Sequence, residues 1–563
     1  MKRRLTIPLL LAATMIFTTT CKDLSLDGIT DGVVLNLDFN VFRTPLIINF
    51  LDANPNNTNA PANLSVRVTG PGANRVYTTD GRRDLVVQDG FMEVSLDRAD
   101  SINADNPLEL TFIAEAPGYL KTVQTVVMYD TNFQFVPVNM VPLNNLPSGV
   151  SMSRGNFTAN STTGTLIPSA FTTPLTGAKQ ERASITVKSG TQVRDASGNN
   201  LNGSVDVQLL HFDNRSEESL QAFPGGLQAE NVIGPNGQAM DALEFVTAGF
   251  IALDMFVGNT EVKTFSRPVE VNVGVNPNTI NPETGMSVQV GDKVPVWSLD
   301  DETGQWTWEQ EATITRNPLG QLEAKFDVDH LSWWNLDWFY GSRCTWREPV
   351  TLQVQSNYED YSAPYAIARL VDATTGARFG SARYLSLRNG STISLYNIPT
   401  GRNLRVQFLS SPSYYCQDVI FESATFTTTC QSVNMIDATR YQPRSRLLVQ
   451  AAVTGICERE EADIQIRPSA WIYYREAGCG YWNWLSYAYS GNFYSNRLEV
   501  GNTYDFRVYY GGQRYDFNNI PIQTTSITAG NYMLNINLDG DFAAMNIENL
   551  RIPDRYCDDL LGG

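Results

Sequence analysis

Apolar and polar residues alternate with a period of two along much of this chain, and this pattern constrains the fold more than any other feature. In the segment LSVRVTG, Leu64, Val66 and Val68 fall on one face, and SVDVQLLHF follows the same rule from Val205. Successive side chains of a strand point to opposite faces, so such runs, bounded by Gly, Pro, Asn and Asp, predict strands of antiparallel sheets. The sequence therefore predicts an all-β fold of tandem, Ig-like β-sandwich modules.

The first 20 residues have the pattern of a bacterial lipoprotein signal peptide. Three basic residues at positions 2–4 precede a mostly apolar run at 5–17, which is too short to span a bilayer as a helix. Cys21 follows, at the position where lipoproteins carry the cysteine that is acylated after cleavage. Thr18 stands where those signals usually have leucine, and the alternative is an ordinary signal peptide followed by an incidental cysteine. We expect lipidation of Cys21.

Lys22 and Asp23 follow the cysteine and resemble the export tag of surface lipoproteins in Bacteroidota, with Leu24 in place of a second acidic residue. The resemblance implies an outer-membrane lipoprotein that is exposed on the surface. The composition of residues 21–35 predicts a tether. Several acyl chains on Cys21 would anchor it stably, because a single chain binds membranes only marginally.

The charge of the chain excludes some partners. It has 41 basic and 59 acidic side chains, a formal net charge of −18. Nucleic acids attract basic surfaces, so we expect no nucleic-acid partner. Anionic lipid would not hold this chain by charge either, so the lipid on Cys21 must anchor it. Plain solubility is the alternative explanation of the acidity.

Turn-rich linkers divide the rest of the chain into modules. We expect a β-sandwich module at 36–143, a larger β-rich region at 148–340, two further β-sandwich modules at 347–441 and 442–541, and an acidic tail at 542–563. The third and fourth modules share a spacing. Gly401 precedes apolar residues at offsets of three, five and seven, and Gly501, 100 residues later, does the same. This predicts a turn glycine that leads into a strand with one buried face.

That pattern, with the upstream strand LLVQAAVTG, resembles carboxypeptidase regulatory-like domains, which are small transthyretin-like sandwiches of bacterial surface proteins. The resemblance covers the first, third and fourth modules. In the second region, the segments ITVKSGTQVRDASGNNLNGSVDVQL, FPGGL, AGFIALDMF, KVPVWSLDDETGQWTWEQEATI and DHLSWWNLD occur in order. They are similar to a module of Bacteroidota lipoproteins and to the ectodomain of cartilage intermediate layer protein. The resemblance implies an extracellular module without catalysis.

The seven cysteines fit an oxidising compartment. If Cys21 is acylated, six remain, and these can pair in fifteen ways. Proximity along the chain favours disulfides between Cys416 and Cys430 and between Cys457 and Cys479, which leaves Cys344 and Cys557 as a long-range pair. The absence of C-x-x-C spacing from the sequence argues against a zinc or redox site.

The segment GCGYWNWLSYAYSGNFY in the fourth module is the most aromatic part of the chain. Trp482 and Trp484 share one strand face, and Tyr487 and Tyr489 share a face as well. One face belongs to a core. The other is predicted to be an exposed platform for sugar rings or a partner protein, because aromatic side chains give a large contact area. The alternative is that both faces are core.

Candidate catalytic and metal-binding residues are few. His330 and Ser332 could share a strand face, but the sequence has no G-x-S-x-G turn. His211 has carboxylates nearby at Asp213, Glu217 and Glu218. Neither histidine predicts a catalytic or zinc site. DANPNNTNA, DASGNNLNG and LDDETGQ offer clustered oxygens for structural calcium, yet none follows the EF-hand pattern, and such residues also form turns. We predict no other cofactor.

The sequence therefore predicts a non-enzymatic cell-surface lipoprotein that displays β-sandwich modules for binding to a glycan, a partner protein or another cell. One alternative is a structural or assembly subunit of an outer-membrane complex. Another is a carbohydrate-active enzyme, because a glycosidase needs only two carboxylates and the chain has 59 acidic residues.

Overall fold

The computed structural model describes residues 42–552, with short gaps at 58, 80, 104, 132, 161–162, 176–180, 340–342, 360–362, 377, 397, 412–417, 443–445, 458–463, 468, 511–512, 530–531 and 540–541. Strands dominate this part of the chain, and its helices are the single turns η1 (Ala73–Arg75) and α2 (Glu217–Gln221). The predicted all-β fold class is confirmed. None of the helices in the described part has the length and apolarity needed to cross a membrane. The predicted signal peptide, Cys21 and the tether lie outside the described residues.

The chain divides into two compact units. The large unit comprises Phe39–Arg446 together with Tyr474–Trp484, and the small unit holds Leu447–Tyr473 and the residues from Leu485 onward. The first three predicted modules therefore belong to one compact unit rather than to three separate ones. Residues 474–484, which we expected in the fourth module, belong to the large unit as well.

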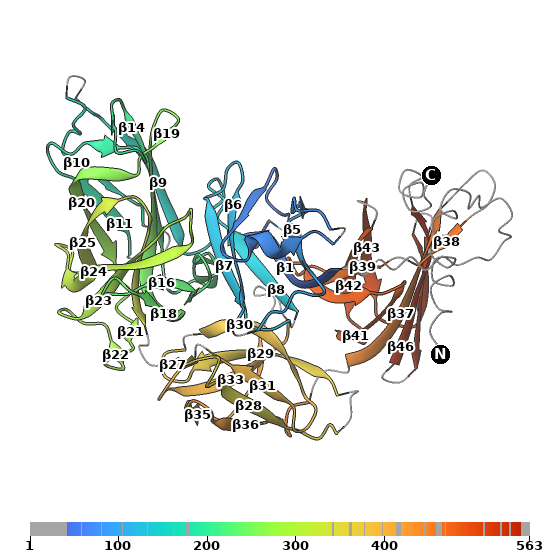
Figure 1. Ribbon diagram of the computed structural model, residues 1–563. Helices are drawn as coiled ribbons and strands as arrows, with labels where there is room; N and C mark the ends of the chain where they lie inside the picture. Colours follow the sequence, from blue (N-terminus) through green and yellow to red (C-terminus); the bar gives the residue numbers. More distant parts are fainter. Residues whose placement is uncertain are drawn as a thin grey trace, which may run out of the picture. The chain divides into compact units, whose positions relative to one another are not determined.

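The first module is a two-sheet sandwich, drawn in blue in Figure 1. One sheet has the order β3-β5-β1-β8 with β4 beside β5, and the other has the order β2-β6-β7. The strands are β1 (Phe42–Asp52), β2 (Ser65–Thr69), β3 (Val76–Tyr77), β4 (Val87–Gln88), β5 (Phe91–Asp97), β6 (Leu108–Glu115), β7 (Thr122–Met128) and β8 (Gln134–Met140). Leu64, Val66 and Val68 pack against the core between these sheets, as their alternation predicted.

The second region, drawn in green in Figure 1, forms a 16-stranded sheet whose main path is β10-β11-β20-β25-β24-β23-β26-β18-β14-β9. Its strands and a separate β21–β22 pair are β9 (Val150–Phe157), β10 (Ser169–Thr172), β11 (Ala183–Val187), β12 (Val193–Arg194), β13 (Asn200–Leu201), β14 (Val205–Phe212), β15 (Gln228–Ala229), β16 (Asn231–Ile233), β17 (Ala239–Met240), β18 (Leu243–Val257), β19 (Thr260–Glu261), β20 (Thr264–Gly274), β21 (Ile280–Asn281), β22 (Met286–Ser287), β23 (Lys293–Leu299), β24 (Gln305–Arg316), β25 (Leu322–His330) and β26 (Trp333–Phe339).

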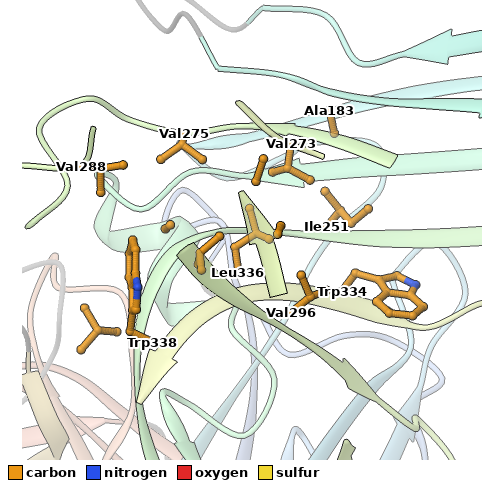
Figure 2. Close-up of a cluster of buried hydrophobic side chains, with 14 of the residues drawn as sticks. Ala183, Ile251, Val273, Val275, Val288, Val296, Trp334, Leu336 and Trp338 are labelled. Atoms are coloured by element: carbon orange, nitrogen blue, oxygen red, sulfur yellow. The ribbon is translucent and has the colours of Figure 1, made fainter. Parts of the chain in front are cut away.

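Both faces of this sheet are buried. On β14, Val207 and Leu209 belong to one hydrophobic cluster, and Phe212 belongs to another. Neighbouring residues of β26 divide in the same way: Trp334 joins the first cluster and Trp333 joins the second. Figure 2 shows part of the first cluster, including Trp334. A sheet with two apolar faces needs a packing partner on each side.

A β-bulge at Gly249 lets the long strand β18 serve both clusters. The register of β18 with β26 shifts between Thr247 and Phe250, and Gly249 adopts φ +133°. Before the bulge Phe245 belongs to the second cluster, and after it Phe250 and Ala252 do. The extra residue therefore changes which positions face each side, and glycine permits the backbone conformation that this requires.

Each cluster of the second region continues into a neighbouring module. The first cluster contains Val350, Leu370 and Phe408 of the third module. The second contains Ile113 and Val123 of the first module. The three modules of the large unit therefore share continuous hydrophobic cores, which explains why they do not separate into independent domains.

The turn that joins β23 to β24 packs against the first module and forms ion pairs with it. Glu302 in this turn forms ion pairs with Arg67 on β2 and with Lys121 beside β7. Gly304 in the same turn has φ +69°, and a Cβ atom there would lie 2.5 Å from Thr125 Oγ1 on β7. The turn therefore fits closely against the β2-β6-β7 sheet.

Gly304→Ala should destabilise the large unit by roughly 1–3 kcal/mol more than Gly320→Ala, because the added methyl group collides with Thr125. Gly320 is a matched control, since it has φ +82° but nothing lies within 4 Å of its would-be Cβ atom. Urea unfolding of the two variants would measure the difference. Equal losses would show that the turn does not contribute to the contact between the modules.

The third module, drawn in gold in Figure 1, has the sheets β31-β28-β36 and β30-β29-β33-β34, with β35 beside β33 and a short β27–β32 pair. The strands are β27 (Arg343–Cys344), β28 (Val350–Gln355), β29 (Tyr365–Asp372), β30 (Arg378–Ser386), β31 (Thr392–Leu395), β32 (Ile398–Pro399), β33 (Asn403–Leu409), β34 (Val419–Glu422), β35 (Phe426–Thr427) and β36 (Val433–Asp437).

Cys344 and Cys430 form a disulfide, with Cα atoms 5.0 Å apart. The predicted pairs Cys416–Cys430 and Cys344–Cys557 are therefore wrong. Proximity along the chain was misleading, because backbone hydrogen bonds hold the loop around Cys430 against residues before β28. Gln431 N, for example, donates to Pro349 O at 2.8 Å. Cys479 is also disulfide-bonded. Cys416, Cys557 and the side chain of Cys457 lie outside the described residues.

Replacing Cys344 and Cys430 together by serine should lower the unfolding free energy of the large unit by roughly 4–5 kcal/mol, because the disulfide closes a long loop in the unfolded chain. The two cysteines are 86 residues apart. Denaturant unfolding under oxidising conditions would measure the loss, and Cys479 stays untouched in this variant. An unchanged unfolding free energy would contradict the assigned role of this bond.

The fourth module follows the third in two further sheets, β38-β37-β46-β45-β44 with β41 beside β37, and β40-β39-β42-β43. The strands are β37 (Arg446–Cys457), β38 (Ile464–Ile466), β39 (Ala470–Glu476), β40 (Asn483–Ala488), β41 (Asn492–Glu499), β42 (Thr503–Tyr510), β43 (Gln513–Pro521), β44 (Thr525–Ala529), β45 (Tyr532–Asp539) and β46 (Phe542–Ile552). The predicted acidic tail thus begins with β46, which pairs with β37 and β45 and completes a sheet.

The predicted pattern of a turn glycine followed by a half-buried strand is confirmed in both modules. Gly401 and Gly501 have φ +69° and +83°. β33 and β42 start two residues after each glycine, and the apolar residues at offsets three, five and seven are buried.

Candidate functional site

A cavity of about 500 Å³ lies where the three modules of the large unit meet, and we call it the three-module cavity. The first module contributes β7 and β8, and the third contributes residues of β29 and β30 together with Tyr396. The second region contributes α2, the segment 223–230, part of β18 and the loop 276–280. Ligand sites typically have volumes of roughly 300–1,000 Å³ and occur preferentially at domain interfaces.

Side-chain amides form one wall of the three-module cavity. Asn214 Nδ2 donates to Thr279 Oγ1 at 2.7 Å and to Thr247 O at 3.0 Å. Asn214 Oδ1 accepts a hydrogen bond from Asn276 Nδ2 at 3.2 Å. These hydrogen bonds hold the amides before any ligand arrives, so little side-chain freedom is lost on binding. The wall is therefore preorganised for a polar ligand.

Seven charged residues line the cavity. They are Arg215, Arg369, Arg378, Arg383, Glu217, Glu230 and Glu244. Arg378 forms an ion pair with Glu217 of α2. Arg369 Nη2 donates to Gln407 Oε1 at 2.8 Å. The side chain of Arg383, an exposed residue of β30, makes no ion pair or hydrogen bond within the described part of the chain.

Glu230 has an altered acidity. The pKa of Glu230 is raised to about 7: burial is the main cause, the neighbouring Glu109 carboxylate on β6 adds to it, and the charge of Arg343 opposes both effects. Burial also raises the pKa of Glu109. Gln228 Nε2 donates to Glu230 Oε1 at 2.9 Å. Near neutral pH, Glu230 is therefore a mixture of a carboxylate that accepts hydrogen bonds and an acid that donates one.

Tyr396 supplies an aromatic surface to the cavity. Its ring meets Tyr129 of the first module edge to face at 5.3 Å between centroids, and Tyr129 stacks on Trp346 at 6.5 Å. Burial raises the pKa of Tyr396, while the charge of Arg383 acts in the opposite direction. The hydroxyl of Tyr396 is therefore neutral and can donate a hydrogen bond.

The acidity of Glu230 should make folding depend on pH. A carboxyl group whose pKa is raised by folding binds its proton more tightly in the folded state, so stability is full below about pH 4.5 and falls as the pH rises through about 7. Glu230→Gln should flatten this fall, since glutamine does not titrate. Denaturant unfolding at pH 5, 6, 7 and 8 would measure it.

The exposed Glu311→Gln variant is the matched control for this experiment and should keep the pH dependence of the unaltered protein. A Glu230→Gln profile parallel to that of the unaltered protein would contradict the assignment of the titration to Glu230.

The four residues of the predicted aromatic platform do not form one exposed surface, because they differ in burial and in packing partners. Trp482 is only 6% exposed, and the guanidinium of Arg475 lies over its ring. Trp484 is half-buried, and its ring centroid lies 4.2 Å from that of Phe133. Tyr487 packs against Trp471 with 4.8 Å between the ring centroids. Tyr489 is 49% exposed. Burial of Trp482 agrees with the alternative that the tryptophan face is core, and among the four residues Tyr489 has the largest exposed fraction.

Each of the two histidines is held by contacts with neighbouring strands. Burial disfavours charge on His330, but the hydrogen bond and charge of Glu309 raise its pKa above the usual value. His330 Nε2 lies 3.3 Å from Glu309 Oε1, whereas Ser332 Oγ donates to Leu299 O at 2.6 Å. The structure therefore does not join His330 to Ser332. His211 is buried on β14, opposite Ile251 of β18.

The oxygen-rich segments considered for calcium use their carboxylates within turns and ion pairs. Asp52 Oδ1 accepts from Asn54 N at 2.7 Å, and Asp195 Oδ1 accepts from Ser197 N at 2.9 Å. Glu302 pairs with Lys121. Over the described ranges, no group of three or more His, Cys, Asp or Glu side chains gathers in a way that could hold a metal ion.

Sequence reasoning missed the three-module cavity because its residues come from segments as far apart as Thr122 and Tyr396. One signal was present. The segment FPGGL, which carried part of the family resemblance, contributes Phe223 to Leu227 to the lining. Its two glycines have positive φ and form a turn that lines the cavity.

Comparison with known proteins identifies no family. No family model matches the chain, and no curated protein matches it. Weak likenesses to solved structures include the Bacillus anthracis TIE protein, at 9% identity and a TM-score of 0.12 over 82% of this chain and 56% of that chain. The major pilin subunit BcpA of Bacillus cereus has 9% identity and a TM-score of 0.12, over 70% of this chain and 98% of that chain.

A third likeness is to the pilus adhesin SpaC of Lactobacillus rhamnosus GG, at 9% identity and a TM-score of 0.13, over 87% of this chain and 55% of that chain. The chain thus spans about half the length of the TIE protein and of SpaC. TM-scores this low do not establish a shared fold, so these likenesses contribute nothing to the assignment of function.

Proposed function

We propose that this chain is a non-enzymatic, lipid-anchored surface protein that binds an oligosaccharide in the three-module cavity. The observation that carries the proposal is the composition of the cavity wall: amide, hydroxyl, carboxyl and guanidinium groups lie beside the aromatic rings of Phe223, Phe245 and Tyr396. A sugar that leaves water must replace the hydrogen bonds of its hydroxyl groups, which both donate and accept. The Asn276 amide uses one N–H on Asn214 and one lone pair on Asn278 N, so it keeps one donor and one acceptor for a ligand.

The geometry favours a small ligand over a docked protein. Protein interfaces are broad, whereas this site is concave and mixes polar groups with apolar side chains such as Phe223 and Phe245. The ring of Tyr396 offers a flat apolar surface beside polar groups, which matches the mixed apolar and polar faces of a sugar ring. Anchoring through Cys21 would display this cavity outside the cell.

Ala382→Trp should lower the affinity for oligosaccharides at least about tenfold, because Ala382 lines the cavity and an indole would occupy part of its volume. Ser394→Trp is the matched control, since Ser394 is an exposed β31 position outside the lining. A glycan array screened with the full chain would identify ligands, and titration calorimetry with each variant would measure affinity. Binding that Ala382→Trp leaves unchanged would contradict the cavity as the site.

A further inference from the structure

We propose that the oligosaccharide received by the three-module cavity is acidic, and that Arg383 binds its anionic group. This inference rests on the proposed function and names the ligand class of the same site. Its starting point is the balance of charge: four arginines and three glutamates line the cavity, in a chain with a formal net charge of −18. The cavity is thus a locally cationic site in an acidic protein.

Arg383 differs from the other arginines of the lining because its charge is not engaged. Arg378 pairs with Glu217, and Arg215 pairs with Glu181 outside the lining. Arg369 is hydrogen-bonded to Gln407. The guanidinium of Arg383 makes no ion pair or hydrogen bond to any part of the chain that the structure describes. A guanidinium presents a planar fork of N–H donors that matches a carboxylate or a sulfate.

The neighbours of Arg383 suit an anion on a sugar. Arg383 and Tyr396 line the same cavity, and the charge of Arg383 acts on the Tyr396 hydroxyl against the opposing charges of Asp130 and Glu230. An anionic group bound at Arg383 would therefore have a hydroxyl donor and an aromatic ring beside it. Of the three lining carboxylates, Glu217 is neutralised by Arg378 and Glu230 is partly protonated near neutral pH, which limits the repulsion of an anion. The third, Glu244, is buried and its charge acts on Arg343.

The test uses the full chain and matched pairs of probes. One pair is tetragalacturonic acid and its neutral methyl ester, and the second is a sulfated disaccharide and its desulfated form. The first pair reports recognition of a carboxylate and the second recognition of a sulfate. Calorimetry at pH 7 should show that at least one acidic probe binds about ten- to one-hundredfold more tightly than its neutral partner, which is the range expected for a charged hydrogen-bonded contact.

Arg383→Gln should remove that preference by weakening the acidic probe about ten- to one-hundredfold while leaving the neutral partner within about twofold. Arg383 is exposed, so this variant should fold, and circular dichroism would check it. Arg440→Gln, at an exposed position of the third module outside the lining, is the control and should bind like the unaltered chain.

Two results would overturn the inference while the proposed function stands: acidic and neutral probes that bind equally but are both excluded by Ala382→Trp, or an Arg383→Gln variant that weakens both partners alike. If oligosaccharides bind and Ala382→Trp changes nothing, the cavity is not the site, and the proposed function falls together with the inference.

Discussion

The burial of both faces of the sheet in the second region is the constraint on which the large unit depends. Adjacent residues of a strand face opposite sides, and on β14 and β26 both sets are apolar. Water cannot cover either face without a large loss of hydrophobic free energy, so each face requires a packing partner. The third module continues the cluster of Leu209 and Trp334, and the first module continues that of Phe212 and Trp333. Three modules therefore share one compact unit.

The same packing creates the three-module cavity. Twisted sheets from three modules do not meet flush at a junction, because the layers diverge where they end. Polar and apolar residues both face this space, and neighbouring side chains satisfy many of the polar hydrogen bonds, as in the network of Asn214 with Thr279 and Asn276. A polar, hydrogen-bonded wall is stable beside water in the absence of ligand. The position of the cavity thus follows from the way the modules share their cores. Its chemistry is set by the side chains that face the cavity.

Much of the local structure could be predicted, and most of the candidate site could not. Alternation near Leu64 and Val205 and the turns at Gly401 and Gly501 identified strands correctly, because each depends on fewer than ten neighbouring residues. The pairing of Cys344 with Cys430 was missed, because it depends on a loop that packs against a segment about 80 residues earlier. The aromatic run near Trp482 was ambiguous, because hydrophobic side chains serve a core as well as a binding surface.

The sequence by itself determined where strands and turns form and which strand faces are apolar, since side-chain alternation and glycine conformation are local properties. Only the tertiary structure decided which modules share a core, which cysteines meet, and that Asn214, Glu230 and Arg383 line one space. The physical reason is that an apolar face does not specify which other apolar face will pack against it. The hydrophobic effect is nondirectional, so the choice among partners is made by the shapes of the packed sheets and by contacts such as those of Glu302 with Arg67 and Lys121.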